Sequence, residues 1–333
     1  MKTVSFGIAS YCVPCSAHCR YCLLSSCGKA TGAGYDESTA FADRVIRELD
    51  EKRPDLNAFF YIGYCMDTPR LFDYIRFSKD HHSPGARFLQ MNGFRSRTDE
   101  AFDELMKGVR DNGVEQIDLT FYGDKNYHDR FAGCKGDFDI LLRMLDAANR
   151  AKLPAIVTVP LFRENLDGMD ALSEALKDRK IKQPFYYLPH NKGRGRALQE
   201  QRLTKQEFDS LPKKIRAGFS KTPHKTEAQW LASGEVKDPE TRNLNLVLTP
   251  ENLPRYADMP AEEILAELEA LDDSCRARMP GVAELAARYG RPDNQQLFRF
   301  RDLLLRWQQE YIADNGGTLY DMQDESHHFS VYK

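Results

Sequence analysis

The stretch SYCVPCSAHCRYCLLSSCGK, residues 10–29, carries five of the eight cysteines of this 333-residue chain. The composition as a whole is that of a globular protein, with 41% hydrophobic and 29% charged residues. The chain is long enough to form one large domain, or a core domain with an appendage. The question is why so many thiols lie in so short a segment.

The spacing of these cysteines is Cys12-x2-Cys15-x3-Cys19-x2-Cys22-x4-Cys27. Two zinc knuckles need about 15–20 residues between their cysteine pairs, and far fewer separate them here. The runs typical of bacterial and plant ferredoxins are also absent from the sequence. The spacing that remains is a C-x3-C-x2-C loop over residues 15–22, with Tyr21 directly before the last cysteine. Three thiolates on such a loop can hold three irons of a [4Fe–4S] cluster and leave the fourth iron open, as a catalytic metal centre requires.

This loop resembles the cysteine motif of the radical S-adenosylmethionine superfamily. The resemblance implies that Cys15, Cys19 and Cys22 hold one [4Fe–4S] cluster whose open iron binds S-adenosylmethionine. It also implies reductive cleavage of that cofactor to a 5′-deoxyadenosyl radical, which abstracts hydrogen from a substrate. The competing interpretation is a zinc or disulfide staple that happens to match. Cys12 and Cys27 lie outside the motif and are interpreted as small apolar residues beside the cluster.

The next 170 or so residues alternate apolar runs with amphipathic segments, which is the pattern of β/α units. Together with the resemblance, this pattern predicts an α/β fold: a partial (β/α)6 TIM-like barrel over residues 1–210, followed by a mainly helical C-terminal extension. The expected strands are Thr3–Ser10, Asn57–Tyr64, Arg87–Met91, Gln116–Phe121, Ala155–Pro160 and Pro184–Leu188. The expected helices are Glu37–Glu51, Pro69–Ser78, Asp99–Asp111, Gly136–Ala151 and Met169–Asp178.

The strand ends should carry the cofactor-binding residues, because active sites of such barrels lie at the carboxyl ends of the strands. In the superfamily the loop after the second strand commonly reads Gly-Gly-Glu and binds the amino group of S-adenosylmethionine. This chain has Gly63-Tyr64-Cys65-Met66-Asp67 there instead. We expect the backbone near Gly63 to accept that hydrogen bond, with Asp67 as a substitute carboxylate.

Three further segments resemble superfamily motifs. Met91–Phe94 is similar to the Thr-Asn-Gly that ends the third strand, which implies a cofactor contact by Asn92. Thr120–Arg130 is similar to the Ser-x-Asp-Gly…His-Asp…Arg segment of peptide-modifying members. Tyr187–Ala197 is similar to the Gly-Arg-Ala segment of molybdenum-cofactor and peptide-maturase members. The predicted cofactor-binding residues are therefore Tyr21, Gly63, Asp67, Asn92, Thr120, Arg130, Leu188 and Pro189.

The C-terminal third, residues 211–333, is expected to form a cap over the barrel mouth and to contact the substrate. A strand is expected over Asn243–Leu248, and amphipathic helices over Pro260–Ser274 and Asn294–Asp314. This third holds a single cysteine, so we expect no auxiliary cluster there. The basic stretch Lys192–Lys225 has ten Lys/Arg against three Asp/Glu and could steer an anionic group. His327 and His328, in the closing segment, are interpreted as lying on a terminal strand.

A formal net charge of −3 gives no electrostatic pull toward nucleic acid or a membrane. No apolar run approaches the roughly 20 residues that a membrane-spanning helix needs. The apolar stretch at the start of the sequence is too short for a signal peptide. We expect a cytoplasmic protein that takes electrons from a donor such as a flavodoxin or ferredoxin and acts on a peptide or small-molecule substrate. The alternative function is a non-catalytic iron–sulfur or zinc protein that uses its cysteines for structure or electron transfer.

Overall fold

The strands and helices alternate along most of the chain, as the sequence pattern predicts. The computed structural model describes residues 1–333 except 11–14, 23–32, 63–66, 84, 182–183 and 318–333. Cys12, Cys27, Gly63, Cys65, His327 and His328 therefore lie outside the described residues. Within the described part, the strands are β1 (Lys2–Ser10), β2 (Asn57–Ile62), β3 (Phe88–Gln90), β4 (Gln116–Thr120), β5 (Ala155–Pro160), β6 (Phe185–Tyr187) and β7 (Thr241–Leu248).

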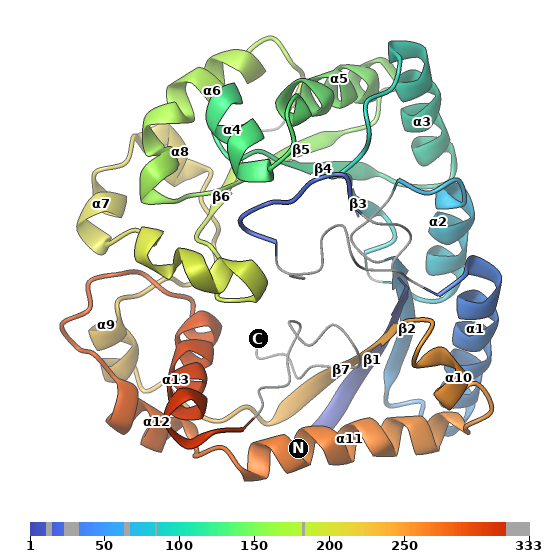
Figure 1. The fold of residues 1–333 in the computed structure, drawn as a ribbon, viewed down its shortest axis with the longest axis vertical. Helices are drawn as coiled ribbons and strands as arrows, with labels where there is room; N and C mark the ends of the chain where they lie inside the picture. Colours follow the sequence, from blue (N-terminus) through green and yellow to red (C-terminus); the bar gives the residue numbers. More distant parts are fainter. Residues whose placement is uncertain (11–14, 23–32, 63–66, 84, 182–183, 318–333) are drawn as a thin grey trace.

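All strand pairs are parallel, and they form two sheets. One has the order β2-β1-β7 and the other the order β3-β4-β5-β6. Figure 1 shows both sheets curving around one centre with helices on the outside. Parallel strands need crossover connections, and helices supply them here by covering the outer face. The predicted α/β fold with a partial parallel barrel is confirmed.

Each sheet has its own helical cover and its own apolar core. The six crossover helices are α1 (Tyr35–Lys52), α2 (Leu71–Asp80), α3 (Asp99–Asp111), α4 (Lys125–Ala132), α5 (Asp137–Arg150) and α6 (Met169–Leu176). Phe102 and Val109 of α3 pack with Leu141 and Leu145 of α5 against the second sheet, and all four are fully buried. Side-chain oxygens cap two of these helices: Thr98 accepts from the backbone of Ala101 at the start of α3, and Asp124 does the same for α4.

Part of the C-terminal third belongs to the barrel and not to the expected cap. The strand predicted at Asn243–Leu248 is present as β7, but it pairs in parallel with β1 from Lys2 to Ser10 and so completes the first sheet. Helix α11 (Ala261–Ala277) packs on the outside, where Ile264, Leu265 and Leu268 share a buried cluster with the apolar face of α1. Part of the segment assigned to a lid is therefore a further β/α unit of the barrel. The physical reason is that β1 lies between two partners and buries both of its edges.

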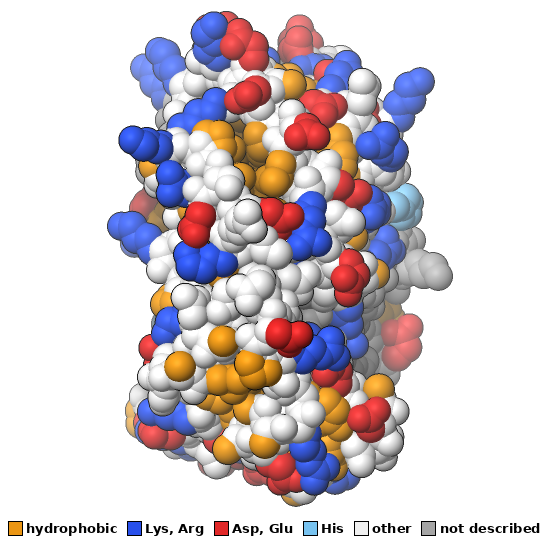
Figure 2. Space-filling model, turned by 90° about the vertical axis from the view of Figure 1, so that its left-hand side faces the viewer, with side chains coloured by type: hydrophobic (Ala, Val, Ile, Leu, Met, Phe, Trp, Pro, Cys, Tyr) orange, Lys and Arg blue, Asp and Glu red, His pale blue; other side chains and the backbone are white. Residues whose placement is uncertain are grey.

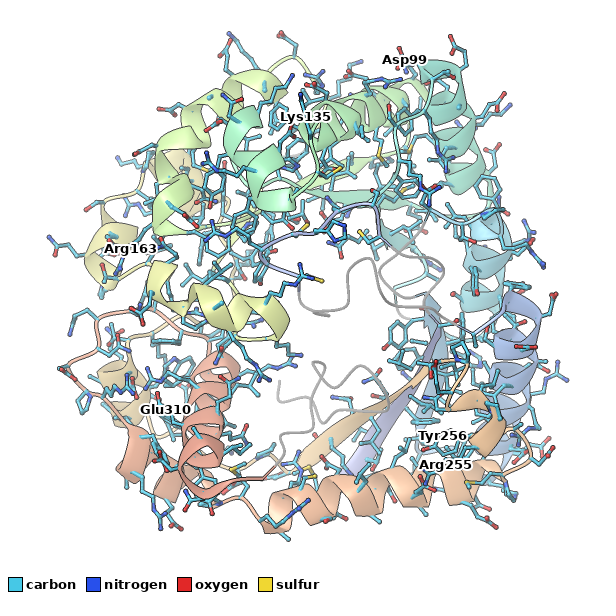
Figure 3. The ribbon with its side chains drawn as sticks, in the orientation of Figure 1. Asp99, Lys135, Arg163, Arg255, Tyr256 and Glu310 are labelled. Atoms are coloured by element: carbon cyan, nitrogen blue, oxygen red, sulfur yellow. The ribbon has the colours of Figure 1, made fainter. Side chains whose placement is uncertain are left out.

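The remaining helices lie along the left and lower rim in Figure 1, apart from the short helix Leu253–Tyr256, which lies on the right beside α1. They are α7 (Lys205–Asp209), α8 (Lys213–Ala217), α9 (Glu227–Ala232), α10 (Leu253–Tyr256), α12 (Val282–Tyr289) and α13 (Phe300–Asn315), with 3-10 segments at Arg163–Gly168 and Gly193–Gln201. Arg255 and Tyr256, side by side in Figure 3, both bond Glu267 and so tie α10 to α11. No helix of the described residues is both long and apolar enough to cross a bilayer.

The basic stretch Lys192–Lys225 is not an open positive face. Lys192 and Arg202 are buried, and three of its surface lysines pair with carboxylates: Lys205 with Asp209, Lys214 with Asp170 and Lys225 with Glu235. Figure 2, which views the side of the molecule on the left of Figure 1, shows basic and acidic side chains interspersed. Such exposed pairs contribute little stability, but they offset part of the positive field that the sequence alone suggests.

Candidate active site

A cavity of about 420 Å³ lies at the carboxyl ends of strands β3 to β6. All three motif cysteines, Cys15, Cys19 and Cys22, line it. Its other lining residues are Tyr21, Gln90, Asn92, Asp118, Thr120, Tyr122, Thr158, Phe185, Tyr187, Leu188, His190, Ser220, Thr222, His224 and Arg299. The volume is typical of a site for a small molecule or cofactor.

Backbone hydrogen bonds fix the cysteine loop against the end of β3 and against α4. The backbone N–H of Ser16 donates to the Gly93 carbonyl (3.2 Å), and its hydroxyl donates to the same oxygen (2.7 Å). On the α4 side, the N–H of His18 donates to Ala132 (2.7 Å) and that of Arg20 to Phe131 (2.9 Å). The scaffold thus holds the loop that carries the three cysteines.

Gly93 is required at the point where the loop passes the end of β3. Its φ is +80°, a region that side chains disfavour. A Cβ there would also stand 2.2 Å from the Cys15 Sγ atom. The Asn-Gly sequence therefore does more than form a turn, because it leaves room for a cysteine sulfur.

Tyr21, the aromatic residue before the last cysteine, anchors the other end of the loop. It is buried edge-on against Phe162 (5.6 Å between ring centroids), and its hydroxyl accepts from the His190 backbone N–H (2.6 Å). The Arg194 N–H donates to the Cys22 carbonyl (2.9 Å). Gly195 lets this segment approach, since a Cβ there would lie 2.5 Å from the His190 carbonyl oxygen. The Gly-Arg-Gly-Arg run after β6 therefore clamps the cysteine loop.

Cys19 is positioned through a chain of contacts from the segment after β4. Tyr122 hydrogen-bonds the Cys19 thiol, and the Tyr122 backbone N–H donates to Nδ1 of His128 (3.1 Å). The other ring nitrogen of His128 bonds the buried Asp137 carboxylate (2.9 Å). His128 therefore fixes this loop.

The donor set fits an iron–sulfur cluster, in which each cysteine binds a different iron. Burial raises the pKa of the Cys19 thiol to about 12, with further increases from Cys15, Asp137 and Cys22. A metal centre would reverse this trend, because a coordinating thiol is deprotonated. The space left by Gly93 beside Cys15 and the Tyr122 bond to Cys19 are both features of a supported ligand loop. Among the described side chains, no three His, Cys, Asp or Glu groups stand close enough to hold a single metal ion.

A chain of polar side chains crosses the floor of the cavity. Gln90 donates to the Thr120 hydroxyl (3.2 Å), which lies 2.9 Å from the Thr158 hydroxyl, and Thr158 donates to the Asp118 carboxylate (2.9 Å). Asn92 bonds both the N–H and the carbonyl of Thr120 (2.9 and 3.0 Å). Most of the hydrogen bonds of Asn92 and Thr120 thus join the end of β3 to the end of β4.

The structure brings half of the predicted cofactor-binding residues together. Tyr21, Asn92, Thr120 and Leu188 line the cavity. The other described members of the set lie elsewhere. The Asp67 carboxylate pairs with Arg97 and accepts from the Arg95 N–H, Arg130 is exposed beside the Tyr127 ring, and the Pro189 carbonyl accepts from Arg202.

Sequence reasoning missed several residues that line the cavity: Asp118, Thr158, His190, His224 and Arg299. The alternation in Gln116–Thr120, with buried Ile117 and Leu119 between polar residues, could have indicated Asp118 as inward-facing. His224 and Arg299 give no such signal, because each lies in an irregular segment between elements of the C-terminal third.

Comparison with known proteins finds partial likeness to solved structures. No protein-family model and no curated protein matches the chain. Streptococcus suis SuiB bound to the precursor peptide SuiA matches with a TM-score of 0.40 and 10% identity, over 57% of this chain and 40% of that one. Coproporphyrinogen III oxidase from Escherichia coli, described as a radical SAM enzyme, gives 0.37 and 9%, over 62% and 50%. The radical S-adenosylmethionine methyltransferase TsrM from Kitasatospora setae gives 0.34 and 13%, over 57% and 36%.

This chain therefore spans half or less of the length of each of these three structures. Over part of its backbone, the chain is similar to solved radical S-adenosylmethionine enzymes.

Proposed function

We propose that this protein is a radical S-adenosylmethionine enzyme that holds one [4Fe–4S] cluster on Cys15, Cys19 and Cys22. When bound, the cluster and S-adenosylmethionine supply a 5′-deoxyadenosyl radical that abstracts hydrogen from a substrate. The single observation that carries the proposal is that all three motif cysteines line one cavity at the carboxyl ends of a parallel barrel.

The residues of the chain have distinct duties in this proposal. Cys15, Cys19 and Cys22 are the ligands, and Tyr122 supports the sulfur of Cys19. Tyr21 and the Arg194 N–H hold the loop in place. The aromatic and apolar wall formed by Phe185 and Tyr187 of β6 and by Leu188, which follows it, would exclude water from the radical.

Cofactor contacts are proposed for Tyr21, Asn92, Thr120 and Leu188, because each lines the same cavity as the cysteines. The Leu188 side chain offers an apolar surface to adenine. Asn92 and Thr120 act chiefly by holding the ends of β3 and β4 at the cavity floor. Gly63, outside the described residues, keeps its proposed role beside the methionine amino group.

The proposal extends to partners and place. A peptide is the favoured substrate class, on the likeness of residues 120–138 to peptide-modifying members, and a small molecule is the second. A flavodoxin or ferredoxin would supply the electron, and the expected place is the cytoplasm. No nucleic-acid partner is proposed, because the net charge is −3 and five of the ten cations of residues 192–225 are buried or paired with carboxylates.

The decisive experiment is anaerobic reconstitution with iron and sulfide, followed by reduction in the presence of S-adenosylmethionine. The proposal expects four irons per chain and release of 5′-deoxyadenosine. A cluster that forms without release of 5′-deoxyadenosine would favour the non-catalytic iron–sulfur protein, and zinc without iron would favour a structural metal site.

A further inference from the structure

The cavity contains two hydrogen-bond acceptors that the proposed function leaves unused. One is the Asp118 carboxylate on β4, and the other is Nε2 of His224 on the segment that follows α8. A buried acceptor without a partner, such as Nε2 of His224, is uncommon in folded proteins and asks for a ligand or another explanation.

Asp118 is an uncompensated carboxylate. Its side chain accepts one hydrogen bond, from the Thr158 hydroxyl (2.9 Å), and no cation of the described residues pairs with it. Burial raises its pKa to about 6, and the Thr158 bond offsets this only in part. A carboxylate in such a place gains from any cation that enters the cavity.

His224 presents a bare acceptor. Its Nδ1 lies 2.6 Å from the Thr222 carbonyl, which can only accept, so the proton belongs on Nδ1. Nε2 is then a lone-pair acceptor, and it is buried without a partner in the described structure. Burial, together with the charges of Arg299 and Arg202, lowers the pKa of His224 to about 4, so the ring is neutral at physiological pH.

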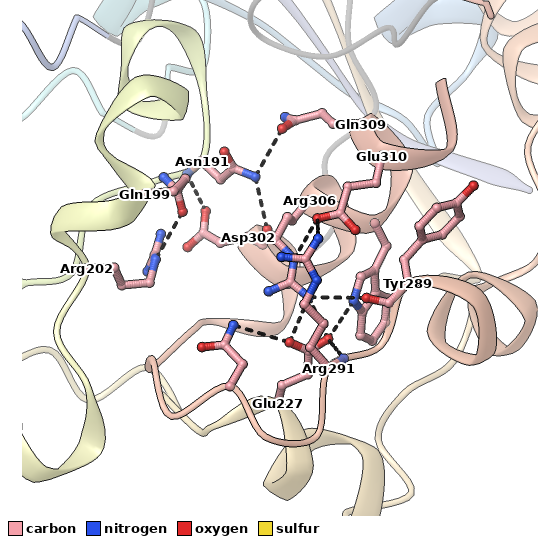
Figure 4. Close-up of polar contacts among 12 residues, drawn as sticks. Asn191, Gln199, Arg202, Glu227, Tyr289, Arg291, Asp302, Arg306, Gln309 and Glu310 are labelled. Carbon is pink, nitrogen blue, oxygen red and sulfur yellow. Dashed lines mark hydrogen bonds and ion pairs between the residues drawn. The ribbon is translucent and has the colours of Figure 1, made fainter. Parts of the chain in front are cut away.

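The one cation on the described cavity wall is paired with a carboxylate, which offsets part of its repulsion of an ammonium group. Arg299 is the one lysine or arginine among the described lining residues. Its Nε and Nη2 atoms lie 2.7 and 2.9 Å from the two oxygens of Asp302, so the carboxylate offsets part of its charge. Asp302 in turn accepts from the Asn191 N–H and joins α13 to the loop after β6 (Figure 4). Burial and the charge of Arg299 lower the pKa of His190 to about 3, which leaves that ring neutral as well.

The cavity also offers aromatic faces. Phe185 and Tyr187 both line it, with their rings stacked 6.3 Å apart between centroids. Aromatic faces attract ammonium groups through the ring quadrupole. The wall is therefore suited to a cation that carries several N–H donors.

We propose that Asp118 and His224 are the acceptors for a protonated amine on the substrate. That the amine belongs to the substrate of the radical reaction rests on the proposed function; the binding of an amine by these two residues does not. The shared chemistry is a primary or secondary ammonium, which a lysine side chain of a peptide and a free polyamine both provide.

The test is calorimetric binding to the full-length protein, both cluster-free and after reconstitution, which requires no turnover. The probes are spermidine, N-acetyl-lysine methylamide and its uncharged counterpart N-acetyl-norleucine methylamide. We expect at least one amine to bind and the norleucine probe to bind at least tenfold more weakly. Preference for spermidine identifies a free polyamine, and preference for the lysine probe identifies a peptide side chain.

The variants separate the subsite from the cofactor site. Asp118→Asn should weaken amine binding at least tenfold and leave the affinity for S-adenosylmethionine unchanged. Asp139→Asn is the matched control, because it removes the same charge at an exposed residue paired with Lys125. His224→Leu should also weaken amine binding, and His224→Gln, which keeps an acceptor, should restore part of it.

Equal binding of charged and uncharged probes would overturn the proposal. So would an Asp118→Asn variant that loses S-adenosylmethionine affinity as much as amine affinity. Failure of the proposed function appears elsewhere, as absent iron or absent 5′-deoxyadenosine, and leaves the amine measurement readable.

Discussion

Replacing Gly93 by alanine should dislodge Cys15 from its ligand position. The new Cβ would stand 2.2 Å from the Cys15 Sγ atom, whereas ordinary contact begins at about 3.4 Å. The sulfur must therefore retreat by about 1 Å, and metal–ligand distances tolerate only about 0.2 Å. The left-handed backbone conformation, with φ of +80° at this residue, also costs an alanine about 1–2 kcal/mol of folding free energy.

Gly136→Ala separates these two effects. Gly136 has φ of +86°, and a Cβ there meets nothing within 4 Å. Both variants should lose about 1–2 kcal/mol in urea unfolding of the cluster-free protein, the cost of a left-handed alanine. Only Gly93→Ala should fall well below four irons per chain after anaerobic reconstitution. Full iron loading and an unchanged electron resonance signal in Gly93→Ala would refute the placement of Cys15 as a ligand.

Three other predictions follow from the same structure. Alanine at Cys15, Cys19 or Cys22 should abolish the cluster, whereas the Cys12→Ala and Cys27→Ala variants should retain it. Iron counts per chain measure this, and a Cys15→Ala variant that keeps its cluster would contradict the ligand assignment. Asp118 has a pKa of about 6 in the folded protein, against an ordinary value of 3.8. Between pH 3.8 and pH 6 the folded state therefore binds more protons than the unfolded state. The free energy of unfolding should fall as the pH rises through this range. The loss is at most about 3 kcal/mol, and urea titrations of the cluster-free protein at pH 4 and 7 should show it in the wild type but not in Asp118→Asn. Leu246→Ala, in the fully buried part of β7, should destabilise the protein by about 2–5 kcal/mol, where an exposed cap would lose almost nothing.

The sequence was informative wherever local pattern and local chemistry coincide. The strand Ala155–Pro160 was predicted with its observed bounds, because an apolar run of 6 residues between loop residues has the length of a strand and is too short for a typical helix. The cysteine spacing likewise singled out Cys15, Cys19 and Cys22, since the three are neighbours along the chain and the structure places all three on one cavity.

Residues that meet only through tertiary structure escaped prediction. Arg299 reaches the cavity because Asp302 and Asn191 dock α13 beside β6, and no local pattern encodes that contact. Asp67 shows the converse: its place after β2 suggested a cofactor carboxylate, but Arg97 lies close enough to pair with it. The pairing of β7 with β1 was also missed, because strand partners distant in sequence leave no periodic signal.

That pairing sets an order of events during synthesis. Ser10 at the end of β1 pairs with Leu248 at the end of β7. The first strand to be synthesised therefore cannot complete its pairing until β7, near the end of the chain, has been made. Until then β1 exposes an unpaired edge, and the cysteine loop that follows it has no complete wall behind it. Long-range parallel pairing folds slowly, and open strand edges promote aggregation. Cluster insertion and folding of the barrel would thus compete in time, and a nascent chain given iron and sulfide too early would bind them on a loop without its support.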